Sequence, residues 1–381
     1  MLNKIIHATI YTPDQILSDQ TIVLKEGKIQ SISPSSKDDP EEKSTCFNAE
    51  GLIVAPGLID IHTHGAMGSD TMDATHTALE TMSTHFSKHG VTSFYATTVT
   101  NPKEAILAAV ETVRNCSNLP GACLLGAHVE GPYINIEQKG AQNPDFFRPP
   151  QPEEYAQWFE SGVVKLVTIA PEIEGMDNFI VECTERGIEL AIGHSSATYE
   201  QVIHAADLGA RQATHLFNGM KGLHHREPGT VGGILADGRI YAQMIVDGIH
   251  LHPAIVKLAV QIKGIERSIL ISDAMRATGL DEGIYDLGGQ EVTVKGGVAR
   301  IANGSLAGST LTLDTAVRNA MQFCEMEFQQ VLPMATRVPA EAMHIYPQKG
   351  AVQVGSDADF AIFDKEYQVV KTIVGGNQIY P

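Results

Sequence analysis

Two histidines, His62 and His64, follow an apolar run at residues 55–61 that has glycines near both ends. Such a run is typical of a buried strand, and side chains two residues apart on a strand project to the same face. Two imidazoles on one face at the end of a strand are compatible with a metal site. An isolated His-x-His pair is more often two strand-end histidines with ordinary hydrogen bonds. The choice between the two depends on what else converges on this strand end.

The chain from residue 51 onward alternates short apolar runs with longer helix-like stretches such as residues 77–89 and 103–115. The apolar runs predict eight strands, at residues 58–62, 93–97, 123–129, 166–170, 189–192, 212–216, 241–246 and 268–272. Eight strands alternating with helices predict an α/β fold, the (β/α)8 barrel, whose functional groups gather at the strands' carboxyl ends. An open doubly wound sheet would need a glycine-rich phosphate loop after the first strand, which residues 65–68 match poorly.

Acids and histidines stand at the carboxyl ends of five of these predicted strands. Besides the histidine pair they are Glu130, His194, His215 and Asp273. Their positions predict convergence at the barrel mouth. Divalent metals such as zinc bind neutral imidazole and carboxylate, so Glu130, His194 and His215 could hold one ion. If the histidine pair holds a second ion, the two oxygens of Glu130 could bridge the two ions.

Both acids in this set, Glu130 and Asp273, have alternative interpretations. Asp273 follows the last predicted strand, where an acid can take a proton from an attacking water and later deliver it to a leaving group. It could instead be a further metal ligand or a cap of the next helix. Glu130 lies in a Glu-Gly-Pro sequence, where a carboxylate can also serve as a turn or capping group.

Length, composition and charge restrict the class of protein. The chain has 381 residues, of which 43% are hydrophobic and 19% charged, and this describes a globular protein with room for a barrel and a smaller unit. Its net charge of -18 argues against a nucleic-acid or anionic membrane partner. Five scattered cysteines without a Cys-x-x-Cys pair fit reduced thiols. No run approaches the ~18 apolar residues of a membrane span. We therefore expect a cytoplasmic protein.

An anionic substrate would need a local basic cluster in such an acidic chain. Residues 224–226 and the stretch around His250 supply one, and the candidate phosphate-binding residues are Asn218, Gly219, His225, Arg226 and His250. Arginine offers a two-pronged contact to a phosphate, while an asparagine side chain and a glycine amide add neutral donors. A solvated loop is the alternative interpretation.

Both ends of the chain predict short strands. Residues 21–25 and 28–32 form a predicted hairpin, the polar residues 33–45 predict a loop, and short strands return at 352–365, 369–373 and 378–380. We expect the two ends, residues 1–54 and 346–381, to pair in a small β-sandwich domain beside a catalytic barrel of residues 55–345.

The motifs resemble those of the amidohydrolase superfamily and, within it, the N-acetylglucosamine-6-phosphate deacetylases. PGLIDIHTH at 56–64 and GSDAD at 355–359 are the superfamily motifs. The family motifs are EGP at 130–132, GHS at 193–195, THLFNGM at 214–220, DGIHLHP at 247–253 and SDAMRATGL at 272–280. They occur in order and span essentially the whole chain.

This resemblance implies an enzyme that hydrolyses N-acetyl-D-glucosamine 6-phosphate to D-glucosamine 6-phosphate and acetate. It implies a divalent metal, most favourably zinc or iron, with one or two ions per subunit. The implied roles are metal binding by Glu130, His194 and His215, acid–base catalysis by Asp273, and sugar-phosphate contacts by Asn218, Gly219 and His250. Arg226 would reach the phosphate bound in the neighbouring subunit of a homodimer.

Three features vary within the family that the chain resembles. Some members lack the first histidine pair and hold one ion, so the presence of His62 and His64 favours two. Some relatives have a histidine where this chain has Gln142. We expect Gln142 to contact the substrate, while polarisation of the acetyl carbonyl would fall more on the metal here. Gly219 replaces an alanine that is common in the family, a mild change because the implied contact is a backbone amide.

Two rival functions make different predictions. A cyclic amidase of the dihydroorotase type uses a modified lysine at the end of the fourth strand, whereas Lys165 falls at the start of that predicted strand. A metal-free barrel with a role in protein assembly would not need all six polar groups.

Overall fold

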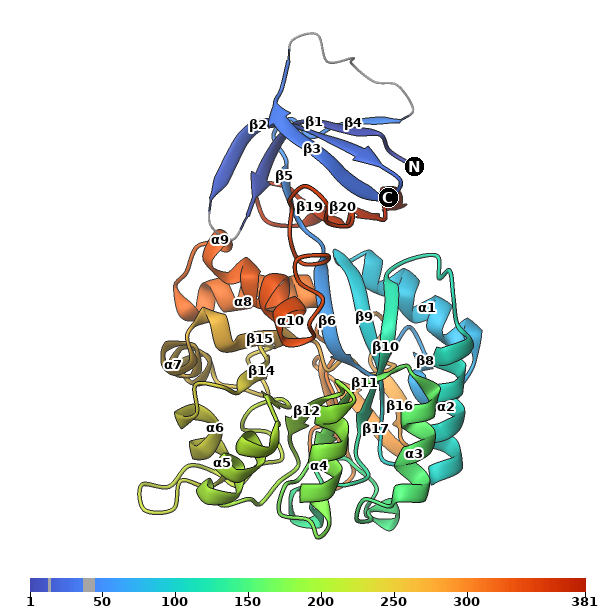
Figure 1. Ribbon diagram of the computed structural model, residues 1–381, viewed down its shortest axis with the longest axis vertical. Helices are drawn as coiled ribbons and strands as arrows, with labels where there is room; N and C mark the ends of the chain where they lie inside the picture. The colour runs from blue at the N-terminus through green and yellow to red at the C-terminus, as the bar shows by residue number, and fades with distance from the viewer. Residues whose placement is uncertain (13–14, 37–44) are drawn as a thin grey trace.

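The computed structural model describes residues 1–12, 15–36 and 45–381. Most of the loop expected at residues 33–45 lies outside these ranges. Figure 1 shows a barrel surrounded by helices and a smaller sheet at one end of it, with both chain termini on that smaller sheet.

The barrel contains eight parallel strands, and each pairs with its neighbours in chain order. They are β6 (Leu58–Thr63), β9 (Val91–Thr98), β10 (Cys123–Glu130), β11 (Val164–Ile169), β12 (Glu189–Ile192), β13 (Gln212–Ala213), β14 (Tyr241–Ile245) and β15 (Ser268–Ile271). The eight predicted strands are confirmed. In Figure 1, β6 runs away from the smaller sheet, so the carboxyl ends of these parallel strands lie at the far end of the barrel.

A buried acid helps to close the barrel between its first and last strands. No regular ladder joins β6 to β15 among the described residues. The backbone N–H of Asp273 donates to the carbonyl of His62 at 2.9 Å. Asp60 Oδ1 accepts from the backbone N–H groups of His62, at 3.3 Å, and Ser272, at 3.4 Å. Burial raises the pKa of Asp60 to about 6. These contacts hold the strand ends that carry His62 and Asp273 side by side.

Helices cover the outside of the barrel because each buries an apolar stripe against it. In α2 the stripe is Ile106, Ala109, Val110 and Val113, the spacing of one helix face. The barrel helices are α1 (His76–Ser87), α2 (Lys103–Asn115), α3 (Pro152–Ser161), α4 (Met176–Glu185), α5 (Tyr199–Leu208), α6 (Gly229–Ala236), α7 (Pro253–Lys263) and α8 (Leu313–Cys324), followed by α9 (Phe328–Val331) and α10 (Arg337–Ala342). No helix in the described part of the chain combines the length and apolarity that a bilayer span requires.

The two chain ends pair with each other, as expected, and their strands form a single sheet. Its strands are β1 (Lys4–Tyr11), β2 (Ile16–Lys25), β3 (Lys28–Pro34), β4 (Cys46–Asn48), β5 (Ile53–Pro56), β19 (Phe360–Phe363), β20 (Val369–Val374) and β21 (Asn377–Tyr380). The sheet folds over its own apolar core, which includes Ile5, Ile22 and Phe360. The return contact from Ile29 N to Ser356 O, at 2.9 Å, ties β3 back towards β19.

Gly57 separates this sheet from the barrel. A Cβ at this position would lie 2.0 Å from Thr92 Oγ1, so only glycine fits where the chain passes from β5 to β6. The domain boundaries expected after residues 54 and 345 stay predictions.

A three-stranded antiparallel sheet between β15 and α8 has no counterpart in the sequence analysis. It consists of β16 (Gly283–Leu287), β17 (Gln290–Lys295) and β18 (Val298–Ile301). Its turns are Gly288-Gly289 and Gly296-Gly297, between residues that alternate in polarity, and this pattern is a hairpin signal. The sheet packs on Ala141 and Met275 and so lies over one side of the barrel mouth.

Candidate metal centre

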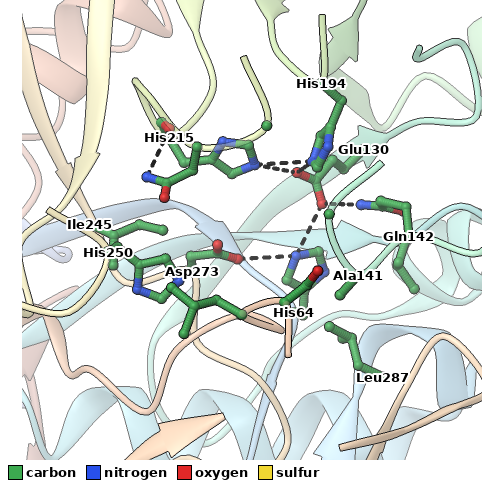
Figure 2. A pocket seen from close by; sticks show the side chains of 17 residues that line it. His64, Glu130, Ala141, Gln142, His194, His215, Ile245, His250, Asp273 and Leu287 are labelled. Carbon is green, nitrogen blue, oxygen red and sulfur yellow. Dashed lines mark hydrogen bonds and ion pairs between the residues drawn. The ribbon is translucent and has the colours of Figure 1, made fainter. Parts of the chain in front are cut away.

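Six polar side chains from the ends of five barrel strands meet in one buried cluster. They are His62, His64, Glu130, His194, His215 and Asp273, all buried. Figure 2 shows five of them, His64, Glu130, His194, His215 and Asp273, directed towards a common centre. The structure thus brings together every residue that the strand-end argument selected.

The first group in this cluster has the spacing of a metal cage. Glu130 Oε1 lies 3.2 Å from His194 Nε2 and 3.1 Å from His215 Nε2, and the two imidazole nitrogens are 3.2 Å apart. Ligands at ~2.0–2.1 Å from a tetrahedral zinc ion are roughly 3.3–3.4 Å from one another. The three atoms therefore fit around one ion of this kind.

A second group adjoins the first. His62 Nε2 and His64 Nε2 are 3.3 Å apart, and Asp273 Oδ1 lies 3.3 Å from the former and 3.2 Å from the latter. Glu130 stands between the groups, since its Oε1 faces His194 and His215 while its Oε2 lies 3.2 Å from His64 Nε2. A carboxylate in this position can bridge two ions.

The imidazoles turn their Nε2 atoms inward. The Nδ1–H of His194 donates to the carbonyl of Gln138 at 2.8 Å, which leaves the Nε2 lone pair free for a metal. Burial lowers the pKa of His215, and no described residue hydrogen-bonds its Nδ1. Burial opposes a charge on His194, but the facing carboxylate of Glu130 raises the pKa of this imidazole, so a bound metal would take the place of a proton at Nε2. The donor set therefore fits a divalent metal.

The two carboxylates in the cluster are ionised. Burial alone would raise the pKa of Glu130, but His62 and the other facing imidazoles hold it well below its usual range. Burial would also raise the pKa of Asp273, but His62 and His64 hold it well below its usual range. Two buried negative charges favour a cation in the cluster.

Three of the six residues have left-handed backbones. The φ angles are 47° at His194, 31° at His215 and 48° at Asp273. A non-glycine residue in this region carries strain of about 1–3 kcal/mol, and such strain concentrates at functional sites. Each residue turns sharply after its strand and so points its side chain across the barrel mouth.

Gln142 contacts the bridging acid directly. Its Oε1 accepts from Thr100 N at 2.8 Å, which fixes the amide so that Nε2 donates to Glu130 Oε2 at 2.9 Å. Gln142 also lines the cavity. Its substrate contact stays a prediction, and the structure adds a hydrogen bond that orients Glu130.

A cavity of about 290 Å³ opens over the cluster. Asn218, Gly219 and His250 line it, and His250 Nδ1 lies 2.7 Å from Asp247 Oδ2. In Figure 2, His250 lies on one side of the acids and Ala141 and Leu287 on the other. The apolar side was missed from the sequence because Leu287 belongs to the unpredicted sheet.

His225 and Arg226 are exposed and do not line this cavity. Arg226 Nη1 contacts His225 Nε2 at 2.7 Å. Their loop, between β13 and α6, projects from the barrel in Figure 1. Within one chain the structure therefore separates these two residues from the other predicted phosphate ligands.

His128 is a buried neighbour of the site that sequence reasoning missed. Its ring packs at 90° to that of His62 with centroids 4.7 Å apart, and its Nε2 contacts Thr168 Oγ1 at 2.8 Å. Burial holds its pKa well below the usual range. Its position two residues before Glu130 on the same strand was the available signal.

Lys165 is exposed at the start of β11, so it cannot supply the strand-end lysine of a cyclic amidase.

A (β/α)8 barrel whose strand ends carry two adjoining sets of imidazole and carboxylate ligands is the architecture of a metal-dependent hydrolase.

Comparison with known proteins identifies the family. The model of the amidohydrolase family matches residues 53–379. The N-acetylglucosamine-6-phosphate deacetylase of Bacillus subtilis (strain 168) is 37% identical over 375 residues, 97% of this chain and 94% of the relative. The N-acetylgalactosamine-6-phosphate deacetylase of Escherichia coli O157:H7 is 36% identical over 371 residues, 96% of both chains. The crystal structure of the N-acetylglucosamine-6-phosphate deacetylase from Pasteurella multocida superposes with a TM-score of 0.93 at 30% identity over 99% of each chain. The chain belongs to the amidohydrolase family, in its N-acetylglucosamine-6-phosphate deacetylase branch.

Proposed function

We propose that the protein hydrolyses N-acetyl-D-glucosamine 6-phosphate to D-glucosamine 6-phosphate and acetate, a step of amino-sugar breakdown or recycling. The observation that carries this proposal is the cavity itself, because Asp273 and the imidazole–carboxylate cluster lie in the same cavity as Asn218, Gly219 and His250. The first set suits amide hydrolysis, and the second offers donors to a sugar phosphate.

Glu130, His194 and His215 would hold the main metal ion, and His62 and His64 would hold a second one with Glu130 between the two. A divalent ion here would activate the attacking water and stabilise negative charge on the carbonyl oxygen. Zinc and iron both accept imidazole and carboxylate ligands, and both stay candidates.

Asp273 would act as general base and then as general acid. Its ionised carboxylate takes a proton from the attacking water, whose oxygen bonds to the acetamide carbon. The protonated acid then gives that proton to the departing nitrogen as the C–N bond breaks, which leaves acetate and the free amine. Gln142 would keep Glu130 oriented during these steps through its 2.9 Å hydrogen bond.

The phosphate would lie near Asn218, Gly219 and His250, which line the same cavity as Asp273. The exposed Arg226, with His225 beside it, would complete this site from the neighbouring subunit of a homodimer, which explains why the loop projects from its own barrel. We also propose a cytoplasmic location, which five free cysteines fit.

The test is amine release from a panel of sugars under identical conditions. N-Acetylglucosamine 6-phosphate should be turned over, whereas N-acetylglucosamine without the phosphate should be a much poorer substrate. The 6-phosphates of N-acetylgalactosamine and N-acetylmannosamine test whether the site accepts a sugar ring of different configuration. Absence of amine release from every phosphorylated sugar with the metal-loaded protein would overturn the proposal.

A further inference from the structure

Glu172, in the loop after β11, hydrogen-bonds to the loops on both sides of it. Its Oε1 accepts from Asn135 Nδ2 at 2.9 Å and from the backbone N–H of Ser196 at 2.5 Å. Its Oε2 accepts from Ser195 Oγ at 2.7 Å. One carboxylate thus joins the loop after β10, which contains Asn135, to the loop after β12, which contains Ser195 and Ser196.

Both of these loops hold His194. The carbonyl of His194 accepts from Asn135 N at 2.9 Å, and its Nδ1–H donates to the carbonyl of Gln138, in the same loop, at 2.8 Å. Ser195 is the next residue in the chain. The left-handed backbone of His194, with φ of 47°, is strained and must be held by such neighbours.

We propose that Glu172 is a positioning residue for the metal centre, which fixes the ring orientation and the tautomer of His194. It does so by holding together the loop that carries His194 and the loop whose carbonyl accepts the His194 Nδ1–H. The inference rests on the proposed role of His194 as a metal ligand. It assigns to Glu172 a task that needs no contact with metal or substrate.

The chemistry of the two acceptor oxygens predicts a graded response to substitution. Glu172→Ala leaves three donors without their acceptor, so the two loops separate and His194 loses its fixed orientation. Glu172→Gln retains one oxygen for the two donors at Oε1, while its amide can donate to Ser195 Oγ. Loss of a partner that bonds a metal-ligating imidazole directly typically weakens metal binding about 10–100-fold. Because Glu172 acts through the loops that hold His194, this range is the upper limit for the alanine variant, and we expect the glutamine variant between the alanine variant and the parent.

The experiment measures zinc dissociation constants by competition with a chromophoric chelator. The parent for these measurements is the double variant His62→Ala/His64→Ala, in which only the group of Glu130, His194 and His215 stays complete. Every other variant is made in this parent. Glu182→Ala is the matched control, because Glu182 is also half-buried and accepts one hydrogen bond, from Tyr155 OH at 2.8 Å, away from the site. Visible absorption of the cobalt-loaded proteins reports on ligand geometry.

Weaker zinc binding and an altered cobalt spectrum for Glu172→Ala, with Glu182→Ala unchanged and Glu172→Gln closer to the parent, support the proposal. Parent-like zinc binding by Glu172→Ala overturns it, even if the melting temperature falls. If the alanine variant does not fold, the glutamine variant decides by the same comparison with Glu182→Ala. His194→Ala tests the ligand assignment separately from the role of Glu172, because parent-like zinc binding by that variant would refute His194 as a ligand.

Discussion

Replacing Asp273 with asparagine tests the proposed acid–base role with little change of shape. Asparagine tolerates the left-handed backbone that this position requires, where φ is 48°. The backbone hydrogen bond to the carbonyl of His62 is retained, because it uses the main-chain N–H. What the variant loses is a negative charge and the ability to take a proton.

The size of the expected effect follows from that loss. General acid–base catalysis contributes typically about 10²–10⁴-fold, and at ~1.36 kcal/mol per tenfold this is about 2.7–5.4 kcal/mol of transition-state stabilisation. The proposed phosphate contacts are Asn218, Gly219 and His250, which the substitution leaves in place, so KM should change little while kcat falls. Asp273 Oδ1 also lies 3.2 Å from His64 Nε2, so the second metal group is weakened as well.

The assay therefore measures kcat, KM and metal content on the same samples. We expect kcat to fall about 10²–10⁴-fold. The ion held by Glu130, His194 and His215 should be retained. Asp281→Asn, at an exposed position, is the control for loss of one acid. Near-native turnover by Asp273→Asn with metal bound would refute the acid–base assignment.

Three further predictions concern metal count, subunit contact and pH. His62→Ala combined with His64→Ala should remove one metal equivalent by elemental analysis; an unchanged metal count would contradict the second ion. Arg226→Ala should lower kcat/KM for the phosphorylated sugar by about 10–100-fold, as expected for loss of a charged hydrogen bond, without affecting the unphosphorylated sugar; equal effects on both sugars would exclude a phosphate contact. Burial lowers the pKa of His85 to about 4, so the unfolded chain binds a proton below about pH 6.5 that the folded chain does not. The free energy of unfolding should therefore decrease as the pH is lowered, by about 1.4 kcal/mol from about pH 7.5 to about pH 5.5. In denaturant titrations His85→Gln should lack this pH-dependent loss of stability; a pH dependence identical to that of the unsubstituted protein would contradict the role of His85.

The barrel and the six clustered residues were predictable because both follow from local pattern. Parallel strands buried on both faces appear as continuous apolar runs, and the end of each run marks where a side chain can reach the barrel mouth. The helix expected at residues 103–115 is α2, with the same bounds. His215 illustrates the limit of this reasoning, since β13 ends at Ala213 and the turn that aims the imidazole lies beyond it.

The remaining features depend on contacts between distant loops, which residue spacing does not encode. The bond from Gln142 to Glu130 requires that Thr100 N fix the amide, and the three bonds of Glu172 join loops of three strands. The sheet that carries Leu287 had a local signal in its paired glycines. Its position over the cavity came only from its packing on Ala141.

The central claim is that the cluster of imidazoles and carboxylates holds a divalent metal that amide hydrolysis requires. The most direct test is elemental analysis of protein purified without added metal, paired with acetate release from N-acetylglucosamine 6-phosphate before and after chelation. We predict at least one equivalent of zinc or iron per chain, loss of acetate release on chelation and its recovery when the metal is restored. Full acetate release by protein that contains no such metal would contradict the claim.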